Sequence, residues 1–112
     1  MSDDIFNFIY NKALDLLSRR EHSSKEIREK LLLRFDDNII INSVITKLEE
    51  NNLINNTRFA EAYVSSRKRK GFGPKKISFE LLSKGVSESV ANRVIDEEGG
   101  WKRAAKLAFT KK

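Results

Sequence analysis

Apolar residues recur along this chain every three or four positions, the spacing that places them on one face of an α-helix. The first series starts with Ile5 and Ile9 and predicts a helix over about residues 4–20. Two further series follow, one through Ile27 and one through Val44. The first half of the chain is therefore expected to form three consecutive helices.

The second half repeats this pattern at an offset of 50 residues, without a gap. The shift pairs Arg19 with Arg69, Lys25 with Lys75, Ile27 with Ile77, Leu31-Leu32 with Leu81-Leu82, Asn42 with Asn92, and Val44-Ile45 with Val94-Ile95. A fixed period that preserves apolar helical positions indicates a duplicated supersecondary unit. We expect an all-α fold of tandem three-helix, helix-turn-helix-like repeats, over residues 1–53 and 54–98. The helices of the second copy are predicted at about 57–70, 74–84 and 88–97.

Polar residues mark where these helices begin and end. Ser23 and Glu26 have the spacing of a capping box, and His22 is placed to pack on Ile27 as a hydrophobic staple. The other expected boundary residues are Asn51-Asn52 after the third helix, Asn56 and Ser87 as N-caps, and Gly71 and Pro74 between the fourth and fifth helices. The helices thus carry their own start and stop signals.

A seventh helix is expected after Gly99-Gly100, which interrupt the periodic pattern. Its apolar face would consist of Trp101, Ala104, Ala105 and Ala108. Residues 99–112 are interpreted as the first helix of an incomplete third repeat. We expect a monomer, although an exposed alanine face on this helix leaves self-association open.

The turn between the fourth and fifth helices concentrates positive charge. Six cations surround it: Arg67, Lys68, Arg69, Lys70, Lys75 and Lys76. The dipole of a helix favours cations in its last turn, so helix stability alone explains residues 67–70. The same dipole disfavours Lys75 and Lys76 in the first turn of the next helix. These two lysines indicate a phosphate-bearing partner.

Charge is divided unequally between the halves of the chain. Residues 1–56 hold 8 basic and 10 acidic residues (net −2), whereas residues 57–112 hold 14 basic and 6 acidic residues (net +8). This asymmetry favours one surface for an anionic partner such as nucleic acid, although a solvated face is the alternative. Together with the turn, it favours nucleic acid or a nucleoprotein.

Two aromatic residues in the second copy could serve either packing or binding. Phe79 stands where the first copy has Glu29, off the stripe of Ile77 and Leu81. Inter-helix core is the favoured interpretation, with packing between the repeats or against a partner as the alternative. Phe72, in the basic turn, could stack on a base or make the hydrophobic contact that accompanies a glycine helix end.

Composition excludes several classes of function. The chain has no Cys and one His, which argues against thiolate or polyhistidine metal sites, and no cofactor is expected. The longest aliphatic run, Ile39-Ile40-Ile41, is far shorter than a membrane span. The Gly71-Phe72-Gly73 sequence lacks the residues of a dinucleotide or phosphate loop, and His22 is better explained as a staple than as a base. We therefore expect a cytoplasmic protein that is not an enzyme.

Three segments between residues 13 and 86 combine into a specific pattern. They are Ala13-Leu14 through Arg19-Arg20-Glu21-His22-Ser23 with Glu26-Ile27 and Lys30-Leu31; Leu53-Ile54-Asn55-Asn56 with Phe59-Ala60; and Arg67-Lys68-Arg69-Lys70-Gly71-Phe72-Gly73-Pro74 with Ile77, Glu80-Leu81 and Lys84-Gly85-Val86. This pattern resembles the RecX family of RecA regulators. The resemblance implies an elongated, curved rod of three-helix repeats that binds in the groove of the RecA–DNA filament. It also implies inhibition of the ATPase, strand-exchange and co-protease activities of RecA.

The chain departs from the family pattern in two places. Asn52 stands where the family usually has Gly, a change that a left-handed helix end tolerates. Family members usually complete a third repeat, so this chain is expected to be a fragment or a short member with a reduced footprint.

The expected contacts to single- or double-stranded DNA and to the RecA filament form two sets. The main set is Arg67, Lys68, Arg69, Lys70, Phe72, Lys75, Lys76 and Lys84, and the weaker set in the first copy is Arg19, Arg20, Lys25 and Arg28. Arg67 is the least certain member, because it continues the buried stripe of Tyr63. The rival hypothesis is a helical module that acts on DNA directly, without RecA.

Overall fold

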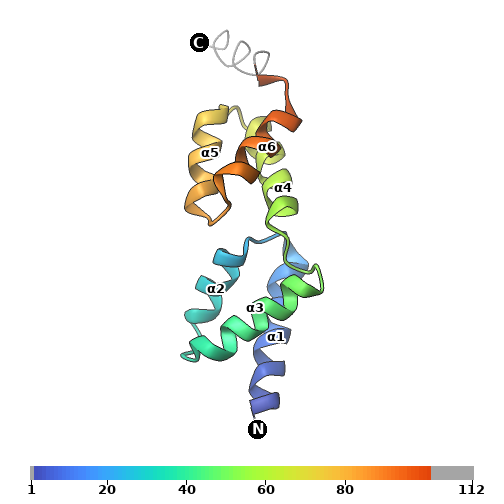
Figure 1. The fold of residues 1–112 in the computed structure, drawn as a ribbon, viewed down its shortest axis with the longest axis vertical. Coiled ribbons are helices and arrows are strands. Elements are labelled where there is room, and N and C mark those ends of the chain that lie inside the picture. The colour runs from blue at the N-terminus through green and yellow to red at the C-terminus, as the bar shows by residue number, and fades with distance from the viewer. Residues whose placement is uncertain (1, 102–112) are drawn as a thin grey trace. The chain divides into compact units, whose positions relative to one another are not determined.

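The computed structural model of the protein describes residues 2–101, which form six α-helices and no strand. The helices are α1 (Ser2–Arg19), α2 (Ser24–Leu32), α3 (Asn38–Glu50), α4 (Asn56–Arg69), α5 (Pro74–Ser83) and α6 (Glu88–Glu98) (Figure 1). The chain divides into two compact units, residues 1–56 (unit 1) and 57–112 (unit 2). The all-α class and the two groups of three helices are as the apolar pattern predicts.

Unit 1 is built around α1, α2 and α3, which all contact one another. Its core contains Ile9, Ala13, Ile27, Leu31, Ile41, Val44, Ile45, Leu48 and Ile54. Ile5 was expected in the apolar stripe of the first helix, but it is half exposed. The fully buried part of α1 therefore begins at Ile9, and Phe6 is partly buried against the same core.

Unit 2 repeats this core at the same offset. Its buried residues are Phe59, Ala60, Val64, Ile77, Leu81, Val86, Ala91, Val94 and Ile95. Four of the five apolar pairs that define the repeat, 27/77, 31/81, 44/94 and 45/95, are buried in both units, whereas the fifth, 32/82, is exposed in both. The sequence period thus corresponds to a repeated three-helix core.

Most of the expected helix starts are confirmed. Ser23 and Glu26 form a complete capping box on α2, and Ser87 caps α6 through the backbone N–H of Val90. The expectation for Asn56 is wrong by one position, because this residue lies inside α4. Its side-chain oxygen instead accepts a hydrogen bond from the backbone N–H of Ser24, at 3.0 Å.

Three helices end in the same left-handed turn. α3, α4 and α5 are followed by a residue with positive φ: Asn52 (58°), Gly71 (93°) and Gly85 (86°). In each, the next backbone N–H reaches back to the carbonyl five residues earlier, as from Phe72 to Arg67 at 3.2 Å. This is the Schellman arrangement. The predicted roles of Asn52 and Gly71 are confirmed.

The described part of the chain ends just after α6. Gly99 and Gly100 both have positive φ, and the indole N–H of Trp101 donates to the carbonyl of Ile95 at 2.7 Å. Trp101 is half-buried and packs against the core of unit 2. The rest of the expected seventh helix, from residue 102 on, lies outside the described residues.

Candidate nucleic-acid interface

The turn between α4 and α5 is rigidly specified on both sides. Gly71 and Phe72 close the end of α4 with backbone hydrogen bonds to Lys68 and Arg67. Pro74 occupies the first turn of α5, and its fixed φ suits that position. The cations that flank this turn are therefore held on well-defined helix ends.

The start of α5 differs chemically from its counterpart in unit 1. α2 is capped by its own Ser23 and Glu26, whereas α5 is preceded by Gly73 with no side-chain cap and has no acid in its first turn. Lys75 and Lys76 occupy that first turn and are exposed. The uncapped positive end of a helix, together with two lysines, is a favourable environment for an anion.

Arg67 does not face solvent as a free cation. Its guanidinium makes two hydrogen bonds to the carboxylate of Glu80, at 3.0 and 2.9 Å, and lies 3.8 Å from the centre of the Phe72 ring. Tyr63 donates a third hydrogen bond to Glu80, at 2.9 Å. The hydrogen bond from Arg67 holds the pKa of Glu80 below its usual range, with a smaller contribution from Tyr63. This arrangement fastens α4 to α5.

Lys68 is also engaged within unit 2. Its ammonium donates to the backbone carbonyl of Gly99 at 2.6 Å and lies 3.4 Å from a carboxylate oxygen of Glu98. It is also 5.4 Å from the centre of the Trp101 ring. Lys68 thus joins the end of α4 to the end of α6.

The remaining cations of the turn are exposed. These are Arg69, Lys70, Lys75 and Lys76, and we call them the exposed basic set. Lys76 extends toward the Phe72 ring, 5.0 Å from its centre. Two members lie at the end of α4 and two at the start of α5, so the set covers both sides of the turn.

Phe72 and Lys84 are less exposed to solvent than the residues of the exposed basic set. Phe72 is partly buried against the core of unit 2, and the guanidinium of Arg67 covers one face of its ring. The contact with the helix end therefore accounts for its position, and that face cannot stack on a base. Lys84 is half-buried, with its ammonium 5.5 Å from the Tyr63 ring.

The expected set in unit 1 is largely paired inside that unit. Arg19 forms an ion pair with Asp15 at 3.3 Å, and Arg28 donates to the side chain of Asn42 at 3.2 Å. Arg20 contacts the carboxylate of Glu26 with both terminal nitrogens, at 3.2 and 3.3 Å. Lys25 is exposed on α2. Unit 1 does not reproduce the exposed basic set.

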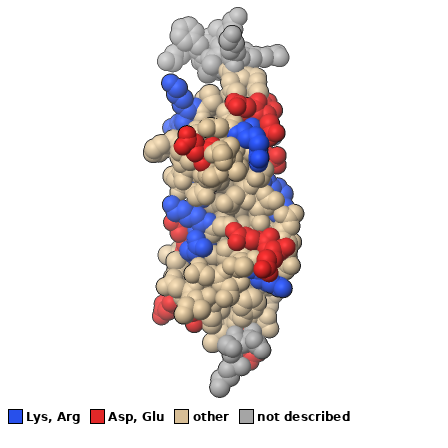
Figure 2. Space-filling model, viewed as in Figure 1, with Lys and Arg blue, Asp and Glu red and all other residues tan. Residues whose placement is uncertain are grey.

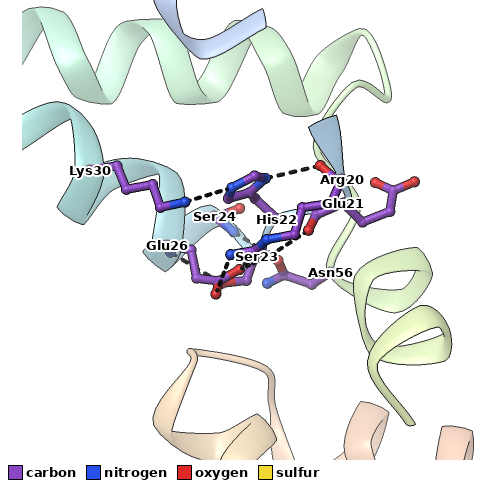
Figure 3. Close-up of polar contacts among 8 residues, drawn as sticks. All are labelled: Arg20, Glu21, His22, Ser23, Ser24, Glu26, Lys30 and Asn56. Atoms are coloured by element: carbon purple, nitrogen blue, oxygen red, sulfur yellow. Dashed lines mark hydrogen bonds and ion pairs between the residues drawn. The ribbon is translucent and has the colours of Figure 1, made fainter. Parts of the chain in front are cut away.

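His22, in the loop between α1 and α2, is a buried polar residue of unit 1 (Figure 3). Its Nδ1 is 3.0 Å from the carbonyl oxygen of Arg20, which can only accept, so Nδ1 carries the proton. Its Nε2 is 3.0 Å from the ammonium of Lys30 and accepts from it. Burial lowers the pKa of His22. The network of His22 is structural, and sequence reasoning missed its partners.

On the face drawn in Figure 2, Lys and Arg side chains lie interspersed with Asp and Glu side chains. The described residues contain no cluster of three or more potential metal ligands, and no described helix is long and apolar enough to cross a membrane. What the described site offers is positive charge in a fixed geometry.

Models of two RecX domains match the chain. The first three-helix domain of RecX matches residues 10–48, and the second three-helix domain matches residues 55–95. The chain belongs to the RecX family. RecX proteins are regulatory proteins and not enzymes, so the expectation of a non-enzymatic protein is confirmed.

Curated RecX relatives agree with this assignment. The chain is 39% identical over 94 residues to the regulatory protein RecX of Halorhodospira halophila, covering 83% of this chain and 58% of that relative. It is 32% identical over 129 residues to RecX of Serratia proteamaculans, covering 95% of this chain and 77% of that relative. This chain thus spans little more than half the length of the Halorhodospira relative.

Solved RecX structures share the fold. The crystal structure of RecX from Lactobacillus salivarius matches with a TM-score of 0.81 at 28% identity, over 96% of this chain and 69% of that one. A second RecX crystal structure matches with a TM-score of 0.86 at 22% identity, over 98% of this chain and 54% of that one. The likeness supports the assignment made from the two domains.

Proposed function

We propose that this RecX chain regulates the recombinase RecA by binding in the groove of the RecA–DNA filament. Its effect is to inhibit the ATPase, strand-exchange and co-protease activities of RecA. The observation that carries the proposal is the exposed basic set, Arg69, Lys70, Lys75 and Lys76, which flanks a fixed turn. Membership in a family of regulatory proteins supports it, and such a partner places the protein in the cytoplasm.

The contacts within this proposal follow from the geometry of unit 2. The exposed basic set binds anionic groups of the filament, and Lys84 lies at the other end of α5, directly after its last turn. Arg67 and Lys68 shape the site indirectly, because Glu80, Glu98 and the Gly99 carbonyl already engage them. The cations of unit 1 contribute less, since Arg19, Arg20 and Arg28 have partners within that unit.

The division of the chain completes the proposal. Residues 1–53 and 54–98 act as two repeats, each contributing one surface to filament binding.

The proposal is tested by following DNA-dependent ATP hydrolysis by RecA while this chain is titrated in. Enough single-stranded DNA is present that competition for free DNA is negligible. We expect inhibition at concentrations far below those needed to coat the DNA. Intact DNA binding without inhibition would instead favour a helical module that acts on DNA directly.

A charge-matched pair of variants makes the same assay specific for the turn. The double variant Lys75→Gln/Lys76→Gln removes two positive charges from the exposed basic set, and Arg34→Gln/Lys47→Gln removes two exposed charges from unit 1. We expect the first variant to need roughly tenfold more protein for half-inhibition and the second to resemble the wild type. Equal effects would show that only net charge matters.

A further inference from the structure

The outer side of α5 carries apolar residues that unit 2 does not bury. Phe79 is 74% exposed and Leu82 is 43% exposed. They are three positions apart, so they are neighbours on the helix surface, and Lys75 and Lys76 lie one turn before Phe79. We call these four residues the α5 face. The interpretation of Phe79 as inter-helix core is therefore wrong.

Comparison with unit 1 shows that the fold does not require Phe79. The matching residue of the repeat is Glu29, which is exposed on α2, and the matching residue of Lys76 is Glu26. Unit 1 keeps the same three-helix core with carboxylates at both positions. The core of the repeat therefore forms without an aromatic residue at this place, whereas the counterpart of Leu82, Leu32, is also an exposed leucine.

The charges around the α5 face define its partner. Glu80, the acid within Pro74–Ser83, is held by Arg67 and Tyr63, so the α5 face combines apolar surface with two exposed lysines. Phosphate contacts would account for the lysines alone. Base stacking could use Phe79 but not Leu82, which has no aromatic face. Carboxylates around an apolar recess complement all four residues.

We infer that the α5 face docks on a protein surface that presents an apolar recess rimmed by Asp or Glu. This inference rests on the proposed function, because the protein in question is the RecA subunit of the filament. Phe79 and Leu82 enter the recess, and Lys75 and Lys76 face its carboxylates. Arg69 and Lys70, at the end of α4, are left for the DNA phosphates.

The test compares Phe79→Gln with Leu33→Gln, a matched change at an 85% exposed apolar residue of unit 1. Both substitutions leave the net charge unchanged, and both sites are exposed, so neither should alter thermal unfolding. Binding is measured to a bare single-stranded oligonucleotide and to RecA filaments assembled on the same oligonucleotide. We expect Phe79→Gln to weaken filament binding about tenfold or more, with bare-DNA binding changed less than twofold.

The other outcomes are equally informative. Equal losses on bare DNA and on filaments would make Phe79 a stacking residue and overturn the inference. Filament binding that is the same for Phe79→Gln and the wild type would also overturn it, while leaving the proposed function intact. A wild-type chain that does not bind filaments at all would refute the proposed function, and the inference with it. Leu33→Gln should match the wild type throughout.

Discussion

His22 and Phe72 occupy the same position of the two repeats, immediately before the cap of the second helix. Phe72 fills the position with an apolar ring that packs on the core. His22 fills it with a buried ring whose two nitrogens are engaged by a backbone carbonyl and by Lys30. This position therefore carries a titratable imidazole in unit 1 and an apolar ring in unit 2.

This difference predicts a pH-dependent stability for unit 1. Protonation of His22 would remove the acceptor for Lys30 and place two cations 3.0 Å apart, beside Arg20 and Glu26. Folding lowers the pKa of His22, so the unfolded chain binds more protons below about pH 6.5 and stability falls as the pH decreases. Thermal unfolding at pH 7.5 and pH 5.5 should show this loss. The loss should shrink in His22→Phe, and an unchanged pH response in that variant would remove His22 as its source.

Arg67 shows which contacts of a single residue can be predicted from the sequence and which cannot. Its position on the stripe of Tyr63 indicated contact with the core, and that indication was sound. The ion pair with Glu80 was not predictable, because it joins residues 13 positions apart across a turn. Sequence spacing places residues on a face, whereas pairing across a turn depends on the geometry of the turn.

At the scale of elements, the residues that begin and end helices were predicted more accurately than the side chains that pack between helices. Asn52, Gly71, Pro74, Ser23 and Ser87 act as expected, because caps and left-handed turns depend on local backbone chemistry. The placement of Phe79 failed, because exposure depends on which helices cover α5. The contacts of Lys68 and Trp101 with the end of α6 depend in the same way on tertiary packing.

The left-handed turn at the end of α3 predicts how substitutions of Asn52 rank in stability. Asn52 has a φ of 58°, which Asn tolerates and Ala does not. We expect Asn52→Ala to lower the free energy of unfolding by about 1 kcal/mol, whereas Asn52→Gly should stay within about 0.5 kcal/mol of the wild type. Urea denaturation measures both. The exposed helical substitution Thr46→Ala serves as a control, and an Ala variant as stable as the Gly variant would contradict the backbone explanation.

At the scale of the whole molecule, the two repeats share a core and differ in their surface charge. Unit 1 pairs most of its candidate cations with its own acids and amides, whereas unit 2 leaves four of them exposed around one turn. The net charges of −2 and +8 for the two halves agree with this contrast. Binding to a polyanion should therefore depend mainly on unit 2.

The salt dependence of DNA binding tests this division. If Lys75 and Lys76 both contact phosphate, Lys75→Gln/Lys76→Gln should reduce the slope of log affinity against log salt by at most about two. The control Arg34→Gln/Lys47→Gln should leave the slope close to that of the wild type. Fluorescence anisotropy with a labelled oligonucleotide over a range of salt concentrations gives both slopes. A slope that does not change would remove the two lysines from the contacts.

At the uncapped start of α5, a side-chain cap is expected to stabilise the helix and to weaken anion binding. A serine in place of Gly73 would give α5 the cap that Ser23 gives α2, and no atom lies within 4 Å of the space that a new Cβ would fill. The same hydroxyl would occupy backbone donors that an anion would otherwise use. A more stable version of this repeat is therefore expected to be a poorer binder. Selection for thermal stability alone would therefore remove one of the features that distinguish the second repeat from the first.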